Sequence, residues 1–177
     1  MYEQGLPVDK AYQPAGSAVS LSIHESQSRL WENHVGRSAA FWRWCFAQLP
    51  DHFGDAFGDL SAEDGFAAAN RVGRTLIRVE ADEATYHLHI IIRYEIEREL
   101  MAQRLDAADV PAAWNQRYKQ YLDVDVPTDR QGCLQDIHWS RANMGYFPTY
   151  SLGSLYAAQF FEAVTESLGD LPGMIRE

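Results

Sequence analysis

The sequence predicts a mainly α-helical fold with at most a short β-hairpin. Apolar residues recur at the i, i+3, i+4, i+7 spacing of a helix in several segments, and no alternating stretch of comparable length competes with them. With 177 residues and 46% hydrophobic content, the chain is long enough to bury one sizeable core. We therefore expect a single domain over residues 1–177.

The first part of the chain predicts a loop, a helix and a connection, in that order. Residues 1–20 are punctuated by Gly and Pro and are expected to form a loop. A Ser-x-x-Glu capping box at residues 22–25 predicts a helix that continues to about residue 46 and is broken at Gly36. Residues 51–65 contain several Gly and Asp residues without a sustained period, so we expect a connection there.

The second part predicts three helices and the start of a fourth. The longest apolar period covers residues 67–104, or 74–104, and predicts a long central helix. Pro111 lies where a first helical turn tolerates proline, and aromatic residues then line one face of a shorter helix, which residues 124–129 are expected to end. A last amphipathic helix is expected over residues 152–168. Residues 171–177 resemble the start of another helix, so the chain is expected to be cut there.

The charge balance and the cysteines narrow the class of protein. The formal net charge of -10 disfavours nucleic acid and anionic membrane surfaces as partners. Cys45 and Cys133 lie far apart without a Cys-x-x-Cys pair, so we expect reduced thiols rather than disulfides or a thiolate metal cluster. We find neither a signal peptide nor an apolar run near the roughly 18 residues of a membrane span. These observations favour a cytoplasmic protein with a small-molecule or peptide partner.

Two polar pairs have a structural explanation and a functional alternative. Glu25 follows Ser22 by three residues and precedes Arg29 by four, so a capping-box acid with an ion-pair partner explains it. Metal ligation is the alternative. Arg78 and Asp82 are four residues apart on the predicted long helix, where an intrahelical ion pair is the simplest explanation. The alternative is that the planar fork of the arginine receives a ligand carboxylate.

Two further groups of polar residues, a histidine pair and residues 132–139, are candidates for a functional site. His87 and His89 are two residues apart in a helical segment, so they face nearly opposite sides and joint metal binding is not expected. Residues 132–139 place an amide, an acid, an imidazole and an indole close together. Such density suits a functional site, and it suits an aromatic-rimmed helix start equally well.

The chain offers an incomplete metal site. A hydrolytic zinc ion takes three protein ligands and a water, often with two His residues one helical turn apart. Residues 24–27, His-Glu-Ser-Gln, supply one carboxylate from Glu25, and the sequence contains no His-Glu-x-x-His. A lone carboxylate neither holds zinc nor lowers the pKa of a bound water toward about 7.

Three motifs, in this order, resemble the zinc metallocarboxypeptidases of the carboxypeptidase Taq type. The His-Glu-Ser-Gln motif of that family stands at residues 24–27, its Ile-Arg-x-x-Ala-Asp motif at 77–82, and its Gly-x-x-Gln-Asp-x-His-Trp motif at 132–139. The flanking residues 28–33 and 146–153 are similar too. The resemblance implies the later part of an irregular helical array, and an enzyme that removes C-terminal amino acids from peptides with zinc-activated water.

The resemblance covers this chain but not the whole family. In the family, the zinc-binding His-Glu-x-x-His-Ala lies immediately before a segment similar to residues 1–7, and helices continue beyond the point that matches Glu177. The chain is therefore expected to be a truncated segment of a larger catalytic domain. Either the reading frame starts upstream of Met1, or the chain is a non-catalytic peptide-binding or oligomeric remnant.

The resemblance also implies roles for individual residues. Glu25 matches the third zinc ligand, left without its two His partners. The implied substrate-binding residues are His24, Arg78, Gln135 and Asp136, and the implied catalytic residues are His138 and Tyr146. Arg78 suits the C-terminal carboxylate of a peptide, and the hydroxyl of Tyr146 suits a tetrahedral oxyanion.

Two consequences follow for the chain by itself. The complete family enzyme would bind zinc and peptide C-termini, whereas this chain is expected to bind no metal and to be inactive. Helices whose partners lie outside the chain would leave apolar faces uncovered, and large apolar patches rarely stay exposed in a soluble monomer. We therefore expect a homo-oligomer.

Overall fold

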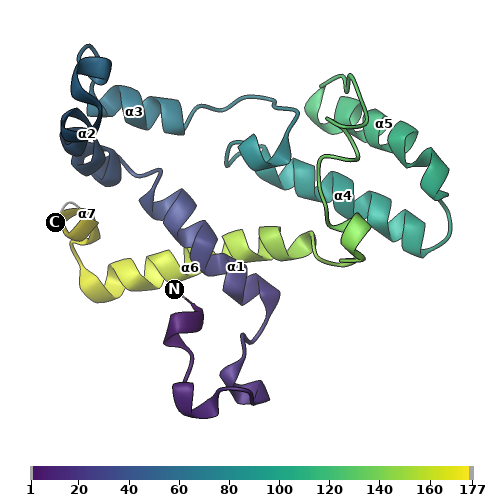
Figure 1. The fold of residues 1–177 in the computed structure, drawn as a ribbon, viewed down its shortest axis with the longest axis horizontal. Coiled ribbons are helices and arrows are strands. Elements are labelled where there is room, and N and C mark those ends of the chain that lie inside the picture. The colour runs from purple at the N-terminus through teal and green to yellow at the C-terminus, as the bar shows by residue number, and fades with distance from the viewer. Residues whose placement is uncertain (1, 176–177) are drawn as a thin grey trace. The chain divides into compact units, whose positions relative to one another are not determined.

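The computed structural model describes residues 2–175, and all regular secondary structure in this range is helical (Figure 1). The mainly α prediction is confirmed, and none of these residues forms a strand. Short 3₁₀ turns and one π-helical segment, Leu30–Val35, connect the α-helices. The α-helices are α1 (Leu21–Arg29), α2 (Ala39–Phe53), α3 (Ala62–Ala69), α4 (Tyr86–Met101), α5 (Val110–Leu122), α6 (Pro148–Leu168) and α7 (Leu171–Ile175).

The chain divides into two compact units. Unit 1 comprises residues 1–71 and 152–177, and unit 2 comprises residues 72–151. The expectation of one domain over residues 1–177 stays a prediction. No helix among the described residues is long and apolar enough to cross a membrane.

In unit 1 the break at Gly36 is confirmed, but the helix before it starts earlier than predicted. The hydroxyl of Ser20 accepts the backbone N–H of Ile23 at 3.1 Å, and the extended backbone of Ser20 makes it the N-cap of α1. Ser22 lies inside the helix and is buried. The capping-box explanation of Glu25 is therefore wrong, because the chain has two serines two residues apart and the first of them caps the helix.

Residues 51–65 of unit 1 are more helical than predicted. Helix α2 continues to Phe53, and α3 begins at Ala62 behind a capping box in which Ser61 and Asp64 exchange hydrogen bonds. Helix α2 packs against both α3 and α7. Residues 2–20 contain only 3₁₀ turns between loop segments, in agreement with the predicted loop.

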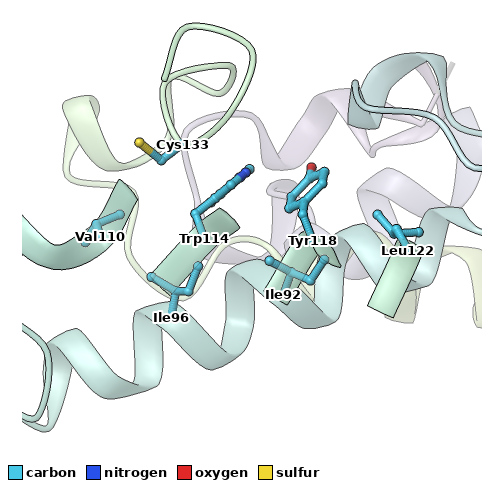
Figure 2. Close-up of a cluster of buried hydrophobic side chains, with 7 residues drawn as sticks. All are labelled: Ile92, Ile96, Val110, Trp114, Tyr118, Leu122 and Cys133. Atoms are coloured by element: carbon cyan, nitrogen blue, oxygen red, sulfur yellow. The ribbon is translucent and has the colours of Figure 1, made fainter. Parts of the chain in front are cut away.

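The core of unit 2 lies between α4 and α5, as Figure 2 shows. Pro111 stands in the first turn of α5, as predicted, and the helix ends at Leu122, followed by Asp123 with a left-handed backbone, φ 52°. One face of each helix is apolar, and Cys133 from the following loop completes the cluster. Its buried members are Ile92, Ile96, Val110, Trp114, Tyr118, Leu122 and Cys133.

The predicted long central helix is wrong in its first half. Helix α4 begins only at Tyr86, and residues 70–85 form irregular chain with a 3₁₀ turn at Arg78–Glu80. Asp82 explains the late start. Its carboxylate accepts the backbone N–H groups of Ala84 and Thr85 at 2.8 and 2.9 Å, so it holds a turn immediately before the helix. The apolar period before Tyr86 therefore reflects burial of irregular chain rather than helix.

The two cysteines behave as predicted. Cys45 and Cys133 are both free thiols. Cys133 is buried in the core of unit 2, and burial raises the pKa of its thiol, so the thiol stays protonated near neutral pH. It acts as a small apolar side chain there.

Candidate functional site

A carboxylate shared by two arginines lies at the centre of the candidate site in unit 2. Oδ1 of Asp136 accepts hydrogen bonds from Nε and Nη2 of Arg78 at 3.0 and 2.7 Å. Oδ2 accepts one from Nε of Arg93 at 2.6 Å. The side chain of Arg93 is 0% exposed and that of Asp136 is 9% exposed, so the pair is shielded from water. Asp136 thus holds two guanidinium groups in fixed positions.

The shared carboxylate stays charged despite its burial. Burial alone would raise the pKa of Asp136, but the charges and hydrogen bonds of Arg93 and Arg78 lower it below its ordinary value. Burial would likewise lower the pKa of Arg78, yet Asp136 raises it. Both arginines therefore remain paired with an ionised carboxylate near neutral pH.

Gln135 ties the same site to the chain before α4. Its Oε1 accepts the backbone N–H of Arg78 at 2.9 Å and Nη2 of Arg93 at 2.8 Å. Its Nε2 donates to the carbonyl oxygens of Leu76 and Gln131 at 3.3 and 2.8 Å. Through Gln135 and Asp136, the motif at residues 132–139 is thus bound to the motif at residues 77–82.

The predicted intrahelical pair between Arg78 and Asp82 is wrong. The two residues do not share a helix, and Arg78 reaches across to Asp136 instead. Asp82 accepts hydrogen bonds from Thr85 and from the backbone N–H of Gly73 at 3.1 Å. These bonds lower its pKa against the opposing effect of burial, so Asp82 shapes the turn before α4.

His138 lies in an aromatic cluster next to the arginine pair. Its ring packs 4.4 Å from the ring centre of Phe147, and its Nε2 lies 2.9 Å from the hydroxyl of Tyr150. Its Nδ1 lies 3.9 Å from Oδ1 of Asp136 and has no hydrogen-bond partner among the described residues. Burial lowers the pKa of His138, which favours the neutral imidazole near pH 7.

Tyr146 stands beside His138 on the loop that follows. The two ring centres are 5.2 Å apart, and Tyr146 also contacts Tyr150 at 5.3 Å. Gly145 precedes Tyr146 with a left-handed backbone, φ 79°, which glycine adopts at no steric cost. The predicted residues of unit 2 thus lie together. They are Arg78, Gln135, Asp136, His138 and Tyr146.

Two residues of this site were missed by the sequence analysis. Arg93 and Glu97 lie one helical turn apart on α4, and both are buried. Glu97 accepts hydrogen bonds from Nε1 of Trp139 at 3.4 Å and from the backbone N–H of Gly145. The sequence did contain one signal for them: Arg93 and Glu97 directly follow Ile92 and Ile96, which belong to the apolar pattern of the helix. Charged residues are rarely buried unless they are paired.

His24 and Glu25 lie on α1 in unit 1. Glu25 is half-buried, and burial raises the pKa of its carboxyl, opposed by the charge of Arg29. A Cβ atom on Gly153 of α6 would lie 3.0 Å from both Cβ and Cγ of Glu25, a tight contact, so α1 and α6 approach each other closely at this glycine. Nε2 of His24 lies 3.5 Å from Oε1 of Glu3, at the surface.

The described residues do not by themselves fit a hydrolytic metal ion. Among residues 2–175, no group of three or more His, Cys, Asp or Glu side chains could hold one. Glu25 offers a single carboxylate. His87 and His89 face different partners, as predicted, with Nδ1 of His87 2.9 Å from the hydroxyl of Ser151 and Nδ1 of His89 3.0 Å from that of Tyr118.

His89 makes the stability of unit 2 depend on pH. Burial, reinforced by the charges of Arg93 and Arg78, lowers the pKa of His89 to about 4. The folded state therefore takes up the proton less readily than the unfolded state, and stability is lost as the pH falls from about 6.5 toward 4. Between pH 7.5 and pH 5, His89 should cost roughly 2 kcal/mol of unfolding free energy.

Urea unfolding of the wild-type and His89→Gln chains at both pH values checks this expectation. Glutamine keeps a polar side chain of similar size next to Tyr118 but does not titrate, so the loss on acidification should be smaller by about that amount. An equal loss in the two chains would contradict the expectation.

The comparisons with known proteins point to one family. The carboxypeptidase Taq (M32) metallopeptidase family model matches residues 1–177. The chain is 50% identical over 171 residues to thermostable carboxypeptidase 1 of Thermus thermophilus, covering 97% of this chain and 33% of that protein. It is 40% identical over 175 residues to carboxypeptidase 1 of Bacillus subtilis, covering 99% of this chain and 35% of that protein.

The solved structures agree with the sequence relatives. The crystal structure of an M32 carboxypeptidase from Deinococcus radiodurans R1 superposes with a TM-score of 0.91 at 42% identity, covering 99% of this chain and 35% of that one. The chain thus spans about a third of the length of the curated relatives that it matches. With the family model matched over all 177 residues, the chain belongs to the carboxypeptidase Taq (M32) metallopeptidase family.

Proposed function

We propose that this segment forms the carboxylate-binding side of a metallocarboxypeptidase site, in which Arg78 receives the C-terminal carboxylate of a peptide. The observation that carries the proposal is the clamp on Arg78 by Asp136. A preset guanidinium loses little freedom on binding, and a bidentate arginine–carboxylate pair is stronger than a neutral hydrogen bond.

Arg78 keeps donors for such a ligand. An arginine has five N–H groups. Within residues 2–175, Asp136 engages Nε and Nη2, and the hydroxyl of Tyr86 accepts from Nη1 at 3.1 Å. One hydrogen bond on each terminal nitrogen leaves one N–H on Nη1 and one on Nη2, which is the number that a carboxylate needs. The ring centres of Phe147 and Tyr150 lie 5.9 and 4.8 Å from the guanidinium carbon of Arg78, and these rings lower the local polarity.

The other residues of unit 2 take supporting roles in the proposal. Gln135 and Asp136 serve the substrate through Arg78, because their polar atoms already bind the two arginines. Tyr146 donates its hydroxyl to the oxyanion that develops on the scissile carbonyl. His138 stays neutral and orients the tyrosines around it, since its Nε2 contacts the hydroxyl of Tyr150. His24, which belongs to unit 1, is proposed separately as a substrate contact.

The metal side of the reaction depends on residues beyond these 177. The family is one of metallopeptidases, and zinc, when bound in such a site, supplies an activated water. We propose Glu25 as one zinc ligand that binds the metal only together with His ligands from elsewhere. Because the sequence contains no His-Glu-x-x-His, the chain by itself is proposed to bind no zinc and to hydrolyse no peptide.

We further propose that the protein is cytoplasmic and self-associates. The support for association lies in unit 1, where an apolar cavity of about 800 Å³ opens beside Trp31 and Trp44, which are 48% and 40% exposed. Apolar surface of this kind is typical of an interface. In a self-associated protein, a second copy of the chain covers this surface.

Titration of the purified chain with an N-blocked dipeptide tests the proposed function. The dipeptide should bind without release of its C-terminal amino acid. Arg78→Lys should weaken binding at least about tenfold, because lysine keeps the charge but loses the planar fork. Arg117→Lys is the matched control. Arg117 is a half-buried arginine of α5 that pairs with Glu95 and Glu99, so its variant should bind like the wild-type chain. Equal binding by the wild-type and Arg78→Lys chains would refute the role of Arg78.

A further inference from the structure

We propose that Arg93 is the positioning residue of this site: it fixes Gln135 and Asp136 and, through them, both the backbone and the side chain of Arg78. The inference rests on the proposed role of Arg78 as the carboxylate-binding residue. It adds a residue outside the three motifs, on the second turn of α4.

Arg93 acts from inside the fold rather than on the substrate. Its side chain is 0% exposed, so a peptide cannot reach it. Nη1 donates to the backbone oxygen of His89 at 2.8 Å and to the hydroxyl of Tyr118 at 3.2 Å. Its guanidinium carbon lies 4.5 Å from the ring centre of Trp114, a typical cation–π distance. Contacts with α4 and α5 thus set its position.

The remaining N–H donors of Arg93 bind two residues that in turn hold Arg78. Nη2 donates at 2.8 Å to Oε1 of Gln135, and the same oxygen accepts the backbone N–H of Arg78. Nε donates at 2.6 Å to Oδ2 of Asp136, whose other oxygen accepts from the side chain of Arg78. One guanidinium therefore orders the amide and the carboxylate that hold Arg78.

Lysine cannot reproduce this arrangement. The fork of Arg93 presents donors in one plane toward Asp136, Gln135 and Tyr118, whereas an ammonium group is a single point charge on a flexible stem. Arg93→Lys keeps the buried positive charge and changes the geometry. A residue that only stabilises the fold would lower the protection of all core amides together, and a positioning residue would release Arg78 first.

Amide hydrogen exchange of the full chain separates these two possibilities. In Arg93→Lys, the protection of the Arg78 amide should fall at least about tenfold relative to the amides of Ile92 and Ile96 in α4. Arg117→Lys, which alters a half-buried arginine away from the site, should leave that ratio unchanged. Unchanged protection of Arg78 in Arg93→Lys, or a fall in step with the two α4 amides, would overturn the inference.

A milder variant covers the case in which Arg93→Lys does not fold. Tyr118→Phe removes the hydroxyl that accepts from Nη1 of Arg93 and, at 3.4 Å, from Nε2 of Gln135, and that lies 3.0 Å from Nδ1 of His89. The amide of Arg78 should lose protection in the same direction, and unchanged protection would count against the inference. The dipeptide titration of the wild-type chain judges the proposed function separately, since it does not depend on how the Arg78 amide exchanges in a variant.

Discussion

An Asp136→Ala chain is expected to lose roughly 3–5 kcal/mol of unfolding free energy. The substitution leaves Arg93, whose side chain is 0% exposed, buried without a carboxylate, and it removes the main partner of Arg78. A buried ion pair adds little net stability compared with apolar residues, but removal of one partner leaves an uncompensated charge and is costly. Urea unfolding at neutral pH measures the loss.

Asp125→Ala is the control for this prediction. The carboxylate of Asp125 lies 3.2 Å from Nζ of Lys119, but its side chain is 87% exposed, so its removal should have little effect. If Asp136→Ala costs no more than Asp125→Ala, the two arginines are not held by a desolvated carboxylate, and the proposed clamp on Arg78 fails.

Trp114→Ala is expected to cost about 3–5 kcal/mol as well, for a different reason. The Trp114 side chain is 1% exposed and lies in the middle of the unit 2 core, between α4 and the loop that carries Cys133 (Figure 2). Its ring stacks on Tyr118 at 5.1 Å and meets Trp139 edge-on at 6.2 Å. Truncation removes these contacts and leaves a cavity beneath Arg93.

Urea unfolding of Trp114→Ala, followed by far-ultraviolet circular dichroism, checks this expectation. Tyr12→Ala in unit 1 is the control, because that ring is fully exposed and its removal opens no enclosed cavity. A loss for Trp114→Ala as small as that for Tyr12→Ala would mean that the core of unit 2 does not depend on the Trp114 ring.

The sequence predicted a helix correctly where the helical apolar pattern begins and ends with the helix. Helix α5 was found because Pro111 and an uninterrupted aromatic face both belong to it. The start of α4 was placed too early, because the apolar period continues through buried irregular chain and only the hydrogen bonds of Asp82 show where the helix begins. A short-range pattern does not reveal such a turn.

The sequence predicted which residues lie in the site, but it did not predict the hydrogen bonds and ion pairs that join them. The motif resemblance placed Arg78 and Asp136 in one site, while spacing alone suggested a wrong partner for Arg78. Arg93 went unnoticed because its partners Gln135 and Asp136 lie more than forty residues further along the chain. A buried charged residue indicates a role in a site only when the fold shows which residue pairs with it.

Unit 1 contributes a different kind of constraint. Gly153 lets α6 approach α1 so closely that the stem of Glu25 is confined between them. A single confined carboxylate, whose pKa is raised by burial, does not make a metal site. We therefore propose that carboxylate recognition belongs to unit 2 of this chain, whereas water activation needs ligands that these residues do not supply.

One measurement tests whether this chain recognises a carboxylate without activating water. The purified chain is mixed with an equimolar amount of zinc and an N-blocked dipeptide, and binding of the dipeptide and release of its C-terminal amino acid are followed together. Saturable binding of the dipeptide, no release, and less than stoichiometric zinc after dialysis are the expected results. Release of the amino acid with one zinc ion retained per chain would contradict the proposal, because a site with only Glu25 as ligand would then have activated water.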